Sequence, residues 1–281
     1  MNHPSRLVSA CAAISAVLAV SAFSATPNYV IKPIPYSAVH HGQKNFPRLP
    51  MWESTSGNWS GYAVPSEVSK TTDMFNLVEG AWQIPTVKGG TTASYSSTWV
   101  GLDGYTTPSV EQTGTEQDWD GTAQQNYVWF EMYPSPAYEI VGFPANPGDI
   151  IWAQVKFVAE TKAGYVFQLT IENLTQNAEF AVPTSYTTVK SAGRKSAEWI
   201  VEAPFDKAIL PLANYGVADF VECEAIGIGK YSIGLGKSGV LEPISSWPSD
   251  PMTMVDPNGG RSTPFALTSG GTAFITDWTA K

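Results

Sequence analysis

The sequence predicts an all-β protein with one large domain over residues 51–281. Three observations favour this fold class. The 281 residues include 24 Gly and 21 Pro, 12% are aromatic, and apolar residues alternate with polar ones over short stretches ending at turn-forming residues. Beyond residue 50 we find no helix-period segment longer than two turns, no internal repeat and no interior linker. Many short strands joined by turns are therefore expected.

The first 25 residues are typical of a signal peptide. Arg6 precedes an apolar run from Leu7 to Phe23, and the small residues up to Ala25 suit signal peptidase. The alternative, an uncleaved membrane anchor, would need about 20 apolar residues and a longer flank. We expect a secreted, extracellular protein without membrane attachment after cleavage, with the periplasm as an alternative location if the source is a bacterium.

Residues 26–50 form a basic leader. They contain several prolines and no hydrophobic period. Residues 1–50 hold four Lys or Arg and no acidic residue, so residues 51–281 carry 12 basic against 25 acidic side chains, a net charge of −13. Two interpretations stay open: a disordered tail, or a removable pro-segment whose positive charge lies on the acidic body.

Strands recur after residue 58 at the spacing expected of a β-sandwich. Phe75–Pro85 is expected as one strand with a bulge at Gly80. The segment 165–173 should turn Phe167, Leu169 and Ile171 inward. The other expected strands cover residues 95–102, 110–114, 127–133, 150–159, 196–202, 220–228 and 273–278.

The strand over residues 127–133 has two different faces. Val128, Phe130 and Met132 alternate on an apolar face that should join the core. The opposite face carries Trp129 and Glu131 between two tyrosines. Alternation therefore predicts an aromatic platform bearing one carboxylate.

The absence of histidine after residue 41 excludes several classes of enzyme. His3, His40 and His41 are the three histidines of the chain, so the body has none for a Ser-His-Asp triad, a Cys-His pair or a His-ligated zinc. Cys223 is the one cysteine left after signal removal, and we interpret it as a small buried apolar residue. Catalysis, if present, must use carboxylates.

Other motifs do not indicate a cofactor, a metal or a nucleic acid. Gly236-Lys237-Ser238 lacks the opening glycine of a phosphate-binding loop. The acidic cluster at Glu116, Asp118 and Asp120 lacks the spacing of an EF-hand. The body lacks clustered Lys and Arg for phosphate contacts. No Asp-Thr-Gly or Asp-Ser-Gly occurs, so a two-aspartate protease site is absent.

Six motifs follow one another in the body. They are Asn58-Trp-Ser-Gly61, Trp99-Val-Gly-Leu-Asp-Gly104, Gln112-Thr-Gly114, Trp129-Phe-Glu-Met-Tyr-Pro134, Glu172-Asn-Leu-Thr175 and Ala197-Glu-Trp-Ile-Val-Glu202. In this order they resemble the glutamic peptidases, the eqolisin or G1 family of secreted, acid-acting endopeptidases. The resemblance covers about residues 57–278.

The resemblance implies a fold and a site. The fold is a concanavalin-like sandwich of two large antiparallel sheets with a concave substrate groove, in a monomer that cleaves polypeptides and is insensitive to pepstatin. The catalytic pair falls on Gln112 and Glu202. The resemblance further places five residues in or beside the groove, and alternation adds Trp129 to them. The five are Trp59, Trp99, Asp103, Glu116 and Glu131.

Two positions depart from the family pattern. Glu116 stands where an Asp is usual, which leaves its role open between it and Asp118. Glu111 replaces an apolar residue before Gln112, and alternation should turn it away from the site. The cysteines common in fungal members are missing, which favours a bacterial source.

The expected pair suits peptide hydrolysis. Ionised Glu202 can deprotonate water and then deliver the proton to the leaving nitrogen, while the Gln112 amide donates to the oxyanion. A neutral amide, unlike a second carboxylate, does not oppose ionisation of Glu202. Activity should fall at low pH as Glu202 takes up a proton. A proton required on a neighbouring carboxyl is one explanation for a fall toward neutrality.

Other interpretations compete with this one. The chain could be a carbohydrate-binding sandwich that stacks sugars on its aromatic face, or a catalytically inactive homologue. A glycosidase would use Glu131 and Glu202 as carboxylates about 5 to 9.5 Å apart. Gln112 could be an ordinary strand residue, and the tryptophans could all belong to the core.

Overall fold

The computed structural model describes residues 29–34, 54–66, 74–229 and 238–280. The expected signal peptide and most of the leader lie outside these residues, as does the Gly-Lys of the Gly236 turn. Within the described part of the chain, no helix is long and apolar enough to cross a membrane.

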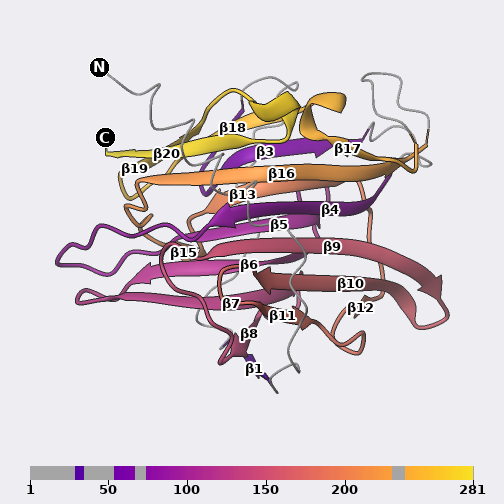
Figure 1. The fold of residues 1–281 in the computed structure, drawn as a ribbon, viewed down its shortest axis with the longest axis horizontal. Helices are drawn as coiled ribbons and strands as arrows, with labels where there is room; N and C mark the ends of the chain where they lie inside the picture. Colours follow the sequence, from indigo (N-terminus) through magenta and orange to yellow (C-terminus); the bar gives the residue numbers. More distant parts are fainter. Residues whose placement is uncertain (1–28, 35–53, 67–73, 230–237, 281) are drawn as a thin grey trace.

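The described chain forms a β-sandwich whose two layers have strands running nearly along the long axis of the molecule (Figure 1). This confirms the predicted fold class. Alternating apolar residues drive it, because each layer buries one face against the other. The first sheet contains, in spatial order, β1 (Val30–Pro33), β8 (Tyr138–Val141), β7 (Gln124–Tyr133), β6 (Val110–Trp119), β5 (Ser97–Asp103), β13 (Ser196–Glu202), β3 (Trp59–Pro65) and the start of β18 (Asp250–Val255).

The second sheet is built around four long neighbouring strands. Shorter strands continue the sheet at both sides. A separate hairpin of two short strands and two 3₁₀ turns complete the described elements. The long strands are β10 (Gly164–Asn173), β9 (Ile150–Thr161), β4 (Met74–Gln83) and β16 (Val217–Ile228); the shorter ones are β11 (Ala178–Ala181), β12 (Thr188–Val189), β17 (Leu241–Pro243), β20 (Phe274–Ala280), β19 (Gly260–Pro264) and β2 (Thr55–Ser56); the hairpin is β14 (Phe205–Asp206) with β15 (Ala208–Ile209), and the turns are η1 (Ile244–Ser246) and η2 (Ser269–Gly271).

Strand β18 belongs to both sheets. Its first residues, Asp250–Met252, pair with β3 in the first sheet, and Met254 and Val255 pair with β19 in the second. The two layers are therefore joined along one side by continuous backbone hydrogen bonds. Sequence alternation did not predict this strand, since Pro251 lies inside it and the strand is short.

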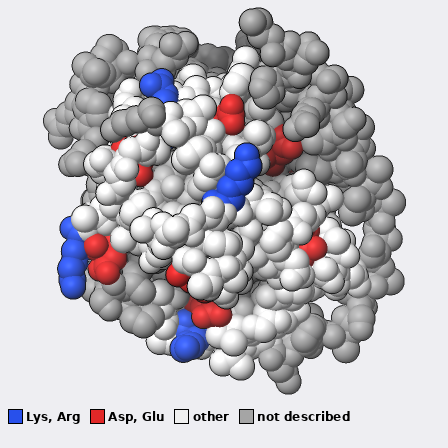
Figure 2. All heavy atoms as spheres, turned by 90° about the vertical axis from the view of Figure 1, so that its left-hand side faces the viewer, with Lys and Arg blue, Asp and Glu red and all other residues white. Residues whose placement is uncertain are grey.

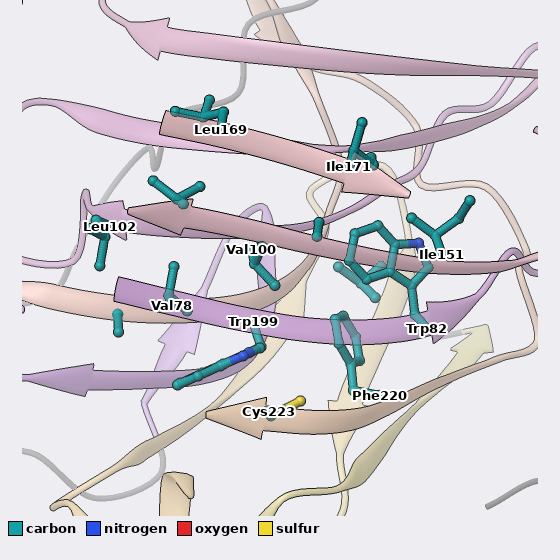
Figure 3. Close-up of a cluster of buried hydrophobic side chains, with 14 of the residues drawn as sticks. Val78, Trp82, Val100, Leu102, Ile151, Leu169, Ile171, Trp199, Phe220 and Cys223 are labelled. Atoms are coloured by element: carbon teal, nitrogen blue, oxygen red, sulfur yellow. The ribbon is translucent and has the colours of Figure 1, made fainter. Parts of the chain in front are cut away.

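The core fills the space between the layers (Figure 3). Phe167, Leu169 and Ile171 of β10 point into it, as predicted, and so does Cys223 of β16, whose side chain has no exposed surface. From the first sheet, Trp199 of β13 enters the same cluster. The expected division of β7 is also confirmed, because Val128, Phe130 and Met132 are core residues.

The predicted bulge at Gly80 is wrong. Gly80 pairs in regular register with Ala153, and the irregularity lies opposite it on β16, at Glu222 and Cys223. Glu222 has a φ of 54°. Gly80 has a packing role instead: a Cβ there would lie 2.9 Å from the Trp199 ring, whose Nε1 donates to the Glu79 carbonyl at 2.7 Å.

The described part of the leader is a strand. Residues 30–33 form β1, which pairs antiparallel with β8 at the edge of the first sheet. Tyr29 packs on Phe143 and Phe180, with ring centroids 5.1 and 5.9 Å away. The prolines at both ends of this segment hid it from the sequence pattern. Residues 29–34 are thus part of the fold.

Candidate active site

The polar residues singled out by the sequence lie on the face of the first sheet that points away from the core. We call it the site face. Pairing across strands β3, β13, β5, β6 and β7 arranges its side chains in three rows. The first row is Trp59, Glu202, Ser97, Glu116 and Tyr127; the second is Gly61, Ile200, Trp99, Gly114 and Trp129; the third is Ala63, Glu198, Gly101, Gln112 and Glu131.

Gln112 and Glu202 project from this face in different rows. Their pairing partners on β5 are Gly101 and Ser97, four residues apart along one strand. The two side chains are therefore set diagonally across β5, with Trp99 in the row between them. Convergence over such a diagonal requires long side chains, and Gln and Glu are each one methylene longer than Asn and Asp.

Two N–H groups hold the Glu202 carboxylate. Asn58 Nδ2 donates to Oε1 and Trp99 Nε1 donates to Oε2, both at 2.9 Å. Glu202, Asn58 and Trp99 are all fully buried. A buried carboxylate needs such donors, since transfer from water without them is strongly unfavourable. The two donors thus fix the orientation of the carboxylate.

Asn58 is a residue of this site that sequence reasoning missed. From the sequence alone it is named only as the first residue of the motif Asn58-Trp-Ser-Gly61, without a role of its own. Asn58 directly precedes β3, and its side chain reaches Glu202, 144 residues further along the chain. The available signal was its position beside Trp59, since Trp59 is the strand partner of Glu202.

Glu131 holds the amide of Gln112. The two residues are direct partners on β6 and β7, and Gln112 Nε2 donates to Glu131 Oε2 at 2.9 Å. This contact fixes which end of the amide is the nitrogen and directs the second N–H of Nε2 elsewhere. The predicted groove residue Glu131 is therefore in direct contact with Gln112.

The three tryptophans of the site face pack together and are fully buried. Trp59 and Trp99 meet edge to face with centroids 4.9 Å apart. Trp129 donates through Nε1 to Ser97 Oγ at 3.1 Å. The predicted platform exists as an aromatic layer: the tryptophan rings have no exposed surface, and the flanking Tyr127 and Tyr133 are partly exposed. Ile34, at the end of the described leader, packs against the apolar cluster of the site face, which contains these tryptophans and five further buried residues.

Glu116 lies in the row of Glu202, on the other side of Ser97. Burial raises its pKa well above the ordinary value, and Asp118 on the same face adds to the rise, with a smaller effect from Glu202. Burial likewise raises the pKa of Asp118. Glu116 therefore favours the neutral acid. A neutral group there limits repulsion of a charged Glu202.

Asp103 lies at the far end of β5 and faces another segment. Its φ is 70°, so its side chain leaves the alternation of the strand. The carboxylate accepts the backbone N–H groups of Arg194 and Lys195 at 2.6 and 2.7 Å. Asp103 thus anchors the approach to β13 and lies one step beyond the row of Gln112.

No group of three or more His, Cys, Asp or Glu in the described ranges is arranged to hold a metal ion.

Comparison with known proteins gives a consistent set of relatives. The model of the peptidase A4 family matches residues 57–263. Scytalidopepsin B of Scytalidium lignicola is 28% identical over 179 residues, which cover 60% of this chain and 65% of that protein, just under two thirds of its length. Aspergillopepsin-2 of Aspergillus niger is 25% identical over 212 residues, or 68% of this chain and 71% of that one.

Solved structures resemble the fold. Scytalido-glutamic peptidase, crystallised with a peptide-based transition state analog, has a TM-score of 0.58 at 21% identity, over 79% of this chain and 98% of that chain. SCP-B, a member of the eqolisin family of peptidases in complex with the tripeptide Ala-Ile-His, has a TM-score of 0.50 at 20% identity, with the same coverage. At these identities the likeness establishes the fold.

Proposed function

The chain belongs to the peptidase A4 family, the glutamic peptidases or eqolisins, and from this membership we propose that it is an acid-acting endopeptidase whose catalytic pair is Gln112 and Glu202. The observation that carries the proposal is the hydrogen-bonding environment of the Glu202 carboxylate. A fully buried carboxylate with one N–H donor on each oxygen lies on the same face as an amide oriented by its own carboxylate.

Glu202 is the proposed general base. The donors Asn58 and Trp99 hold the carboxylate in one orientation, which lowers the reorganisation needed when it takes a proton from water. The water oxygen attacks the scissile carbonyl carbon, and the proton on Glu202 then passes to the leaving nitrogen. One residue thus serves both proton transfers.

Gln112 is the proposed oxyanion donor. Its Nε2 carries two hydrogens, and the contact with Glu131 uses one of them. The other is the group that would donate to the developing oxyanion. A preoriented donor of this kind is worth about 100-fold to 1,000-fold in kcat.

Cleavage of a protein substrate between about pH 2 and 5, with pepstatin present, tests the pair. Glu202→Gln should abolish cleavage, because an amide cannot act as base, and Gln112→Ala should lower kcat by at least 100-fold. Far-ultraviolet circular dichroism checks that each variant is folded. Wild-type rates in either folded variant would remove that residue from the pair.

The alternatives are less well supported. In a glycosidase, Glu131 would have to act as an acid or nucleophile, but it accepts a hydrogen bond from Gln112. A sugar-stacking surface needs exposed rings, and Trp59, Trp99 and Trp129 have none of their surface exposed. Figure 2 shows isolated Lys and Arg side chains on the end of the molecule that it displays, and no basic patch suited to a nucleic acid.

The domain organisation is also a proposal. Residues 1–25 would direct secretion, and residues 26–50 would be a pro-segment removed from the body at 51–281. Two contacts support a masking role: β1 pairs with β8, and Ile34 packs on the apolar cluster of the site face. The full burial of Glu202 and Gln112 means that substrate access requires part of the structure to move.

Sequencing the N-terminus of the protein at successive times after acidification tests the pro-segment. Loss of the leader should coincide with the rise in activity. Ile34→Glu should speed this activation, because it places a charge against the apolar cluster of the site face. Full activity with an intact leader would contradict the masking role.

A further inference from the structure

Three buried carboxyl groups gather around the strands beside Gln112, with Glu198 on the site face and Glu111 on the opposite face of the sheet. They come from three neighbouring strands: Asp103 ends β5, Glu111 precedes Gln112 on β6, and Glu198 lies on β13 in the row of Gln112. All three side chains are fully buried. None of them is needed for the proposed proton transfers, so their presence in the interior calls for another explanation.

Asp103 is the member of this group best suited to carry a negative charge. Its two oxygens accept separate backbone N–H groups, from Arg194 and Lys195. These donors lower its pKa, although burial is the larger effect and the net shift is upward. A carboxylate held by two backbone donors is stable in the interior, and it fixes the segment before β13.

Glu111 has the opposite surroundings. Among the described residues, no N–H or O–H group donates to either of its oxygens. Burial raises its pKa well above the ordinary value, and the neighbouring carboxyl of Asp103 raises it further. As a neutral acid, Glu111 can donate its own proton to Asp103. As an anion it would face a second negative charge without a donor.

Glu198 is a third acid of the same kind. No described donor makes a hydrogen bond of normal geometry to its oxygens. Burial raises its pKa well above the ordinary value, with weaker opposing effects from the Ser196 hydroxyl and the Tyr105 backbone N–H and a further upward effect from Asp103. It is separated from Gln112 in its row by Gly101, which has no side chain.

Arg194 is the cation that acts on the cluster, and its other neighbours are acidic. The Arg194 guanidinium lies over the Phe157 ring at 3.7 Å and lowers the pKa of Glu111. On the β18 side, Tyr105 donates to Asp250 at 2.8 Å. Beyond Arg194, the acidic groups Tyr165 and Glu160 interact with that guanidinium. Arg194 is shared between the cluster and Glu160, so a second carboxylate in the cluster adds negative charge without a further cation in these contacts.

We propose that Asp103, Glu111 and Glu198 act as one proton-sharing group with its single charge on Asp103, and that loss of a second proton displaces β6 and Gln112. The cluster would thereby set the upper pH limit of activity. Displacement reaches Gln112 directly, because Glu111 is its chain neighbour and Glu198 its row neighbour. Glu111 and Glu198 are positioning residues in this scheme, since they act through the strand that carries Gln112.

Proton linkage gives the direction in which the stability of the folded protein changes with pH. The folded protein keeps protons on Glu111 and Glu198 above about pH 4.3, the ordinary Glu pKa at which the unfolded chain loses them. The folded state then binds more protons than the unfolded state. Stability therefore falls as the pH rises from about 4.3 through the raised pKa values, and acid favours the folded protein.

The test measures two pH profiles on purified wild-type protein and on Glu111→Gln and Glu198→Gln. The first is the melting temperature from pH 3 to 8, which does not depend on activity. The second is kcat/KM for a peptide over the same range, which rests on the proposed function. Each variant removes one titrating proton and keeps the side-chain shape. Each should move the decline of both profiles upward by about one pH unit or more, with kcat/KM at pH 3 to 4 within about threefold of wild type.

Glu172→Gln is the matched control. Glu172 is half-buried on the outer side of β10, and burial raises its pKa too. Its variant should leave the kcat/KM profile unchanged and shift the melting profile less than either cluster variant, because Glu172 is only half-buried and lies far from Gln112 in the second sheet. If Glu111→Gln does not fold, Glu111→Leu removes the same proton with an apolar chain of similar size. Profiles of the cluster variants that follow wild type, or shift no more than Glu172→Gln, would overturn the proposal. Wild-type protein inactive at every pH would instead remove the peptidase function and leave the melting profile to decide the cluster.

Discussion

Two sets of buried carboxyl groups in the first sheet have opposite surroundings. One is Glu202, and the other is Glu111 with Glu198, beside Gln112. At Glu202, N–H donors from Asn58 and Trp99 meet both oxygens of one carboxylate. Beside Gln112, Glu111 and Glu198 are just as buried. No described donor bonds to Glu111, and Glu198 has only weak contacts with the Ser196 hydroxyl and the Tyr105 backbone N–H. Burial alone therefore does not decide the charge of an acid in this sheet. The N–H donors at Glu202 are placed to hold an anion, whereas burial favours the neutral acid at Glu111 and Glu198.

The largest effect should come from moving the charge of Glu202 without removing it. Glu202→Asp keeps a carboxylate but withdraws it by one methylene from both donors and from the diagonal toward Gln112. A displacement of about 1 Å at a reacting group costs on the order of 100-fold, so kcat/KM should fall by about that factor. Peptide cleavage at pH 3 to 4 measures it. Rates within threefold of wild type would show that the position of the carboxylate relative to Asn58 and Trp99 does not matter for its role.

The second comparison removes one indole N–H from each of two neighbouring rings. Trp99→Phe takes a donor from Glu202, and Trp129→Phe takes one from Ser97 Oγ. Each leaves a buried acceptor with one donor fewer, at about 1 to 3 kcal/mol of folding stability. Only the first should lower kcat, by about 10-fold or more, because only it changes the orientation of the proposed base.

Chemical unfolding and peptide cleavage on the same two preparations separate these effects. Equal losses of kcat in both variants would mean that the aromatic layer acts through general packing. A loss confined to Trp99→Phe would assign it to the bond with Glu202.

The smallest loss of activity should come from weakening the contact between Glu131 and the side-chain amide of Gln112. Glu131→Gln lets residue 131 accept from Gln112 through its amide oxygen, but the bond loses its charge assistance, which roughly halves its strength. We expect kcat to fall only a few-fold, with KM nearly unchanged. Steady-state kinetics at pH 3 to 4 measures both constants. A 100-fold loss would indicate that Glu131 takes part in chemistry, beyond orienting Gln112.

The sequence predicted the faces of the strands well, because each face is a local property of alternation. Residues 196–202 form β13 with the expected bounds, and β7 divides into core and site faces as expected. The assignment of Gln112 and Glu202 as a pair came from motif resemblance, and their catalytic roles stay predictions.

Contacts that cross several strands were not predictable. Asn58 lies outside the alternation of β3, and its contact with Glu202 depends on strands β3 and β13 being neighbours. Alternation correctly predicted that Glu111 points away from the face of Gln112. No local sequence pattern, however, predicts that Glu111 lies beside Asp103. The backbone of Asp103 adopts a left-handed φ of 70°, which redirects its carboxyl out of the strand pattern.

The pairing of β1 with β8 bears on how the protein behaves in concentrated solution. Strand β8 has β7 on one side and the four residues of β1 on the other, so the leader supplies the last hydrogen-bonded edge of the first sheet. A chain cut after residue 34 and stripped of β1 would present a bare row of backbone N–H and C=O groups. Such rows recruit strands from other molecules. Self-association would then depend on whether the first strand stays attached.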